Sequence, residues 1–307
     1  MSAGNRLSAS SAGGSIYDLG YRHYEGPRRG RGYAVWSLYV ESLRGIWGFG
    51  RPMSAKVAPF ILAGLYAFFA FLQLAFASTL ANEISSGQQV QLFTYDSYFT
   101  QFGFLLILFC VAQAPEVVCR DQRYQVLPLY FTRAMGRADY ALARLASLAT
   151  ALFLALIVPM IALFVSDVLM KPDTIGAIGD ELPRALPAIP ACLLIAASMA
   201  SISLALSSYS PRRAYSAIGL IAYFLLMEAV PAIIYAVANH GGVNSADKLV
   251  LLAPITSLSG ATDWFFGQSL SSDFPTTLGS EAYVLACLVS VAVFTAVLVF
   301  RYRRIPA

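Results

Sequence analysis

Histidine is almost absent from this chain, which contains only His23 and His240. A zinc site or a nucleophile activated by imidazole needs histidine beside other reactive side chains. The sequence has no HExxH and no GxSxG pattern, and the run SLSG at 257–260 lacks the first glycine of the second pattern. We therefore expect no catalytic residue and no metal site.

Lysine is also rare, and none of Lys56, Lys171 and Lys248 follows a glycine and precedes Ser or Thr as in a P-loop. If ATP is used, a second polypeptide must hydrolyse it, so we expect no cofactor on this chain. The four cysteines show no CxxC pair. We expect them to be small buried apolar residues rather than disulfide partners or metal ligands.

Charged residues make up only 12% of the chain, whereas 58% of its residues are apolar. A soluble fold of this size would leave too much apolar surface in water. Six stretches are long enough for the roughly 20 helical residues that cross a bilayer. These stretches cover residues 57–80, 97–115, 145–166, 185–211, 214–237 and 282–300. We predict an all-α polytopic membrane protein with six transmembrane helices.

The basic residues give the predicted orientation, because Lys and Arg near the ends of spans stay in the cytoplasm. With both termini inside, 18 of the 21 basic residues fall on the cytoplasmic side. The apolar run 249–262 is too short to cross, and counting it as a span would place Arg301, Arg303 and Arg304 outside. We predict that it is an outer re-entrant or interfacial segment before the last span.

The N-terminal region divides into two parts ahead of a six-span domain at 57–307. Residues 1–14 are rich in Ser, Ala and Gly without an apolar core, which predicts a flexible tail rather than a cleaved signal peptide. Within 15–56, residues 33–47 have apolar side chains at helical spacing, although Leu38 is an exception and Ser42 falls on the polar side. We expect an amphipathic helix on the inner membrane surface; the alternative is a helix packed on other cytoplasmic protein.

Basic and aromatic residues alternate at 21–31, a pattern that can bind RNA. Next to a first span, the same charges retain the segment in the cytoplasm and attract anionic lipid. We expect membrane lipid, and not nucleic acid, to be the partner of this cluster.

The loop between the second and third spans predicts a short helix at about 115–126. Pro115 suits a first helical position, Glu116 in the first turn faces the positive end of the helix dipole, and Pro128 disfavours helix at the residue before it. Glu116 also precedes Arg120 by four residues, a spacing that favours an ion pair. Such a helix could dock a soluble partner; the alternative is a solvated loop supported by lipid headgroups.

Two segments of this loop resemble the signature of type-2 ABC exporter permeases. They are APEVVCRD at 114–121, and LPLYFTR at 127–133 followed by RADYALAR at 137–144. The N-terminal YDLGYR at 17–22 and EGPR at 25–28 are similar to a bacterial branch of that family. The resemblance covers most of the chain and is most specific in the two loop motifs.

The resemblance implies a permease subunit in the bacterial cytoplasmic membrane, paired with a second permease, identical or homologous, and with two P-loop ATPase subunits that bind ATP and Mg. The loop helix would be a coupling helix that inserts into a groove on the ATPase. The matching positions are Glu116, Arg120, Asp121, Arg123, Arg133 and Tyr140. A cytoplasmic N-terminal interface would contain Tyr21, Arg22, Arg28 and Arg31.

Glu228 is the only ionisable residue inside a predicted span, and Pro231 follows it by three residues. A carboxylate in the bilayer costs several kcal/mol unless it is paired, protonated or hydrated, and the proline can kink the helix. We consider two roles for Glu228: a gate or substrate path between two permeases, or a hydrogen-bonded carboxyl that holds helices together.

Three other classes of protein remain as alternatives. A six-span channel or ion-coupled carrier commonly has several intramembrane charges or an internal repeat, and this sequence shows only Glu228 and no clear repeat. An intramembrane enzyme lacks its nucleophile and metal ligands here. A membrane anchor for other proteins would not require six spans.

Overall fold

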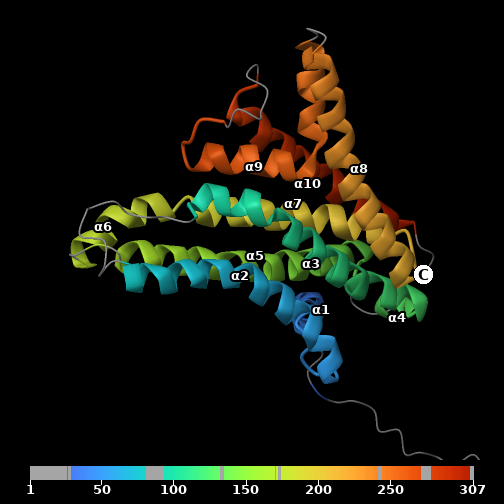
Figure 1. The fold of residues 1–307 in the computed structure, drawn as a ribbon. Helices are drawn as coiled ribbons and strands as arrows, with labels where there is room; N and C mark the ends of the chain where they lie inside the picture. The colour runs from blue at the N-terminus through green and yellow to red at the C-terminus, as the bar shows by residue number, and fades with distance from the viewer. Residues whose placement is uncertain are drawn as a thin grey trace, which may run out of the picture.

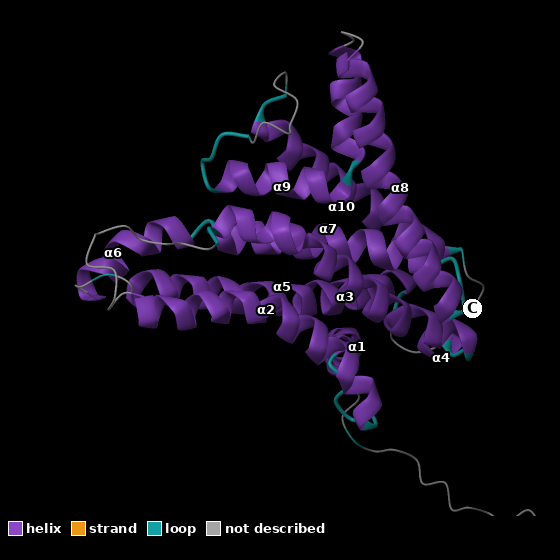
Figure 2. Ribbon diagram, viewed as in Figure 1, coloured by secondary structure: helices purple, strands orange, loops and turns teal. Residues whose placement is uncertain are grey.

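The computed structural model describes Gly26 and residues 29–80, 93–131, 135–169, 171, 174–240, 244–270 and 278–304. Within these ranges the regular structure is helical and contains no strand (Figure 2). The tail predicted at 1–14 lies outside the described residues, as do Tyr21, Arg22, Arg28 and Arg133.

Six helices in the described ranges are long and apolar enough to cross a membrane. They are α2 Met53–Leu80, α3 Tyr95–Arg123, α5 Arg137–Leu169, α7 Ala188–Ser207 with α6 Thr174–Ala185 before it, α8 Arg213–His240 and α10 Ser280–Arg303. By length and composition, the prediction of six spans in an all-helical protein is confirmed.

Helix α5 lies at the centre of the bundle, with α2 packed on one side and α7 on the other (Figure 1). Leu148, Leu152 and Leu156 recur every four residues and are fully buried, so they form one continuous stripe. Helix α7 contributes mostly Ala and Ser to its contacts, and small residues allow two helix backbones to approach closely. Helix α8 diverges from this layer and leaves most of its apolar side chains exposed.

The first helix, α1 Arg31–Ile46, forms where the sequence predicts one, but a different face is buried. Leu38, Ser42 and Ile46 are buried against the bundle, whereas the exposed fraction of Trp36 is 62%. The sequence placed Leu38 and Ser42 off the apolar face of this helix, and the structure shows that this assignment was wrong. The reason is a tertiary contact, because α1 packs on α5 and Ser42 has a polar partner there.

The prediction of a separate loop helix at 115–126 was also wrong. Helix α3 continues through Pro115, which is buried in its interior, and ends at Arg123. After a turn in which Gln125 has a φ of 52°, a short helix α4 Leu127–Phe131 begins, with Pro128 in its first turn. Pro128 therefore lies in the first turn of a second helix, a position where a missing N–H does no harm.

The apolar run before the last span consists of two short helices, η1 Asn244–Leu252 and α9 Pro254–Phe265. Ala253 is the N-cap of α9 and Pro254 is its first residue. Helix α9 packs closely on α10, since a Cβ added at Gly260 would lie 2.6 Å from Cγ of Tyr283. The run is therefore not a single helix, and neither part is among the six spans.

Candidate functional site

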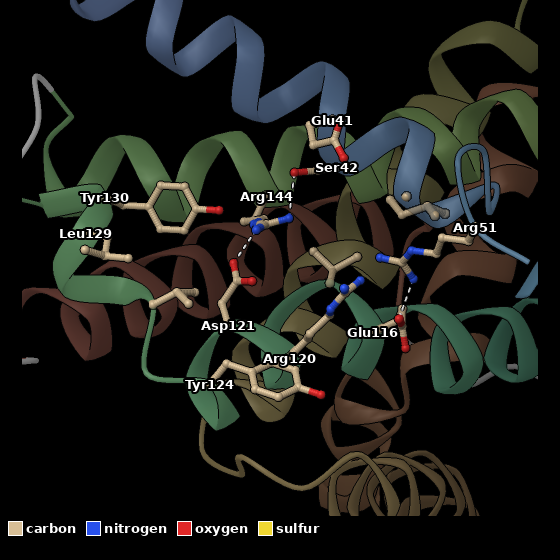
Figure 3. Close-up of a pocket in the computed structure, with 14 residues that line it drawn as sticks. Glu41, Ser42, Arg51, Glu116, Arg120, Asp121, Tyr124, Leu129, Tyr130 and Arg144 are labelled. Atoms are coloured by element: carbon tan, nitrogen blue, oxygen red, sulfur yellow. Dashed lines mark hydrogen bonds and ion pairs between the residues drawn. The ribbon is translucent and has the colours of Figure 1, made fainter. Parts of the chain in front are cut away.

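Glu116 joins three parts of the chain near the end of α3. Its carboxylate accepts a hydrogen bond from Arg51, in the connection between α1 and α2 (Figure 3), and forms an ion pair at 2.7 Å with Arg213, the first residue of α8. The Glu116 side chain is 15% exposed. The last turns of α3 are therefore held to the start of α2 and to the start of α8.

Asp121, five residues further along α3, forms a second junction. It forms an ion pair with Arg144 of α5 and accepts a hydrogen bond of 2.7 Å from the hydroxyl of Tyr140. Arg144 also donates to Oγ of Ser42 on α1, at 2.8 Å. Arg144 is only 9% exposed, so its charge depends on Asp121 for compensation. This arrangement, which we call the Asp121 junction, connects α1, α3 and α5.

A cavity of about 540 Å³ lies between these two junctions, bounded by α1, α3, α4 and α5 (Figure 3). Charged side chains of both signs line it: Glu41, Arg51, Glu116, Arg120, Asp121 and Arg144. Tyr130 of α4 closes one side, and burial raises the pKa of its phenol, which keeps it neutral at physiological pH.

The tip between α3 and α4 is the exposed part of the site. Arg120 and Arg123 are exposed, and the exposed fractions of Tyr124 and Leu129 are 65% and 66%. We call these four residues the α3–α4 tip. They present two cations next to an aromatic and an aliphatic side chain, a combination that suits a protein surface.

The structure separates the residues that the resemblance grouped together. Arg120 and Arg123 are exposed, and Arg120 also lines the cavity, whereas Glu116 and Asp121 are engaged by arginines of the same chain and Tyr140 is fully buried. Arg31 and Arg133 do not contribute to the described tip. Arg31 pairs with Asp139 on α5 at 2.6 Å, and Arg133 is outside the described residues.

Sequence reasoning did not name Arg51, Arg144 and Arg213 as site residues, although Arg144 ends the RADYALAR motif at 137–144. Their partners lie 65, 23 and 97 positions away in the sequence, too far for helical spacing to indicate the pairs. The one available signal was Arg144, which directly precedes a long apolar run and therefore needs a counter-charge.

Glu228 on α8 contacts the N-terminus of α9. Its carboxylate accepts hydrogen bonds from the backbone N–H groups of Ile255 at 3.1 Å and Thr256 at 2.9 Å, and another from the Thr256 hydroxyl. These are donors that a helix leaves unpaired in its first turn, where negative charge is favourable. The geometry supports the role of Glu228 in holding helices together, while Pro231 is buried within α8, which continues to His240.

All four cysteines are buried, as the sequence predicts for small apolar residues. Across the described ranges, no group of three or more His, Cys, Asp or Glu residues could hold a metal ion. The chain matches no known protein-family model and no curated protein.

Proposed function

We propose that this chain is the permease subunit of a bacterial ATP-binding-cassette exporter and that the α3–α4 tip docks a separate ATPase. The observation that supports this proposal most is the position of the tip beside two charged junctions. Through Glu116 and Asp121, a force applied at Arg120 or Tyr124 reaches α1, α2, α5 and α8. A partner that pushes on the tip can thus bias the arrangement of several spans.

The chemistry of the tip indicates what the partner groove contains. Arg120 and Arg123 require acidic or carbonyl acceptors, and Tyr124 requires an apolar pocket with a polar rim. The coupling element is therefore the continuation of α3 together with α4, rather than a separate helix starting at Pro115. Glu116, Asp121 and Tyr140 act behind this surface as positioning residues.

The rest of the assembly follows from the exposed apolar helices. Both α8 and α10 leave large apolar side chains uncovered, which in a membrane face lipid or a second permease copy. With the tip and both termini in the cytoplasm, α1 lies along the inner surface with Trp36 available to the headgroups, and α9 lies at the outer side. Substrate movement would use ATP and Mg bound by the two ATPase subunits.

Affinity purification of the full chain from its native membranes tests the proposal. We expect a separate P-loop ATPase to co-purify. We expect Arg120→Glu with Arg123→Glu to reduce both co-purification and stimulated ATP hydrolysis without lowering membrane insertion. Arg303→Glu with Arg304→Glu is the matched control, because both are exposed arginines on the same side. Intact coupling in the tip variant would refute docking there.

Orientation is tested separately by cysteine labelling at Arg120. Arg120→Cys should react with a membrane-impermeant maleimide in inverted vesicles and not in intact cells. Labelling from outside the cell would overturn the orientation and the ATPase partner together, and would favour a channel or carrier.

A further inference from the structure

A second cavity, of about 490 Å³, lies within the spans and away from the α3–α4 tip. Helix α7 forms one wall, α8 and α10 form the sides, and the η1 and α9 segments cover the end. Its volume falls in the range of about 300–1,000 Å³ that is usual for small-molecule sites. None of its walls comes from α1, α3 or α4, so it is distinct from the docking site.

The lining is neutral and mostly apolar. Its polar groups are the hydroxyls of Ser198, Tyr223, Ser257 and Ser290, and the remaining side chains are apolar, including Met227 and Val293. Ser257 donates its hydroxyl to the carbonyl of Leu251, which leaves it less available to a ligand. A charged or strongly polar ligand would lose its hydration here without compensation, so the occupant must be uncharged and apolar.

Two contacts join the helices around this cavity. The rings of Tyr223 on α8 and Phe294 on α10 meet edge to face with centroids 6.0 Å apart, and both residues line the cavity. In addition, the hydrogen bonds from Ile255 and Thr256 to Glu228 hold α9, which also lines the cavity, against α8. The cavity is therefore enclosed by elements that are held to one another by direct contacts.

We propose that this cavity binds one acyl chain of a membrane phospholipid. The walls from α7, α8 and α10 belong to membrane spans, so the medium around the cavity consists of acyl chains. The neutral lining complements a hydrocarbon and excludes the headgroup, which stays at the membrane surface. An unfilled cavity of this size would cost stability, and an acyl chain restores the lost contacts. This site does not depend on the proposed ATPase partner.

Photo-crosslinking of the full chain in nanodiscs tests the site. The probe is a phosphatidylethanolamine with a diazirine on one acyl chain, and the adducts are mapped by mass spectrometry. We expect adducts on Cys287 and Ser290, which line the cavity, as well as on exposed residues such as Leu288. Cys287 is only 3% exposed, so an adduct there requires an acyl chain inside the cavity.

Cavity-filling variants supply the second arm of the test. Ala286→Phe should reduce the Cys287 and Ser290 adducts severalfold, whereas Ala292→Phe, an exposed alanine on the same helix outside the cavity, should not. Ser290→Phe provides an independent filling variant if Ala286→Phe fails to fold. Adducts confined to exposed residues of the wild-type chain, or cavity adducts unchanged by filling, would overturn the proposal.

Discussion

Asp121 on α3 and Arg144 on α5 form an ion pair that is almost completely shielded from solvent, with side-chain exposures of 13% and 10%. Tyr140 and Ser42 complete the polar contacts of the pair. The position next to the α3–α4 tip is consistent with the coupling role that we propose. Two charges that are buried together stabilise the helix arrangement only as long as both are present.

Removing one charge of this pair should be costly. We expect Asp121→Asn to destabilise the chain by about 3 kcal/mol, because it leaves the Arg144 guanidinium buried without compensation. Thermal unfolding in mild detergent measures the effect. The double variant Asp121→Asn with Arg144→Met should recover part of the loss. Asp139→Asn is the control, since its partner Arg31 is 69% exposed and such pairs contribute at most about 1 kcal/mol. Equal effects of the two single variants would contradict this account.

Gly260 permits the close approach of α9 to α10. An alanine Cβ at this position would overlap the buried ring of Tyr283, which cannot move without disturbing its neighbours. We expect Gly260→Ala to cost about 1–3 kcal/mol and to lower the melting temperature. Gly219→Ala is a matched control, because no atom lies within 4 Å of its added Cβ. A melting temperature for Gly260→Ala equal to that of the control would show that α9 and α10 are not packed in this way.

Glu228 should matter for the order of α9. In Glu228→Gln the amide NH₂ faces the donors of Ile255 and Thr256, so at least one hydrogen bond is lost, at a cost of about 1–3 kcal/mol. Hydrogen exchange should increase at residues 255–258. Glu281→Gln, an exposed acid at the start of α10, is the control. If exchange rises while transport and stimulated ATPase activity stay unchanged, the role of Glu228 as a gate is refuted.

Asp263 predicts a pH dependence of stability. It lies on α9, outside the six spans, and burial, together with the charge of Asp96, raises its pKa to about 6. The folded chain therefore holds this proton more strongly than the unfolded chain, whose pKa stays near 3.8. Stability should fall as the pH rises from about 4 to about 6 and then level off. Asp263→Asn should remove this decrease; an unchanged profile would mean that Asp263 is solvated.

The local elements of this protein were partly predictable. Apolar length indicated the six spans, because a helix must satisfy all its backbone groups when it crosses hydrocarbon. Helix start and stop signals were less reliable. Pro115 is typical of a first helical position, yet in the structure it is buried inside α3, which continues to Arg123. The face of α1 was assigned wrongly for a similar reason, since Ser42 is buried by a hydrogen bond from Arg144 that no local pattern of apolar residues reveals.

Composition and hydropathy by themselves determined that this chain is helical and able to cross a membrane six times, because both properties depend on short-range chemistry. Only the tertiary structure decided which charges stay exposed. Helical spacing predicts Arg120 as the partner of Glu116, but the structure pairs Glu116 with Arg51 and Arg213 from distant segments. Asp121 likewise pairs with Arg144, while Arg120 and Arg123 stay exposed. Ion pairing between segments that are far apart in the sequence depends on distance in space and leaves no periodic signal along the chain.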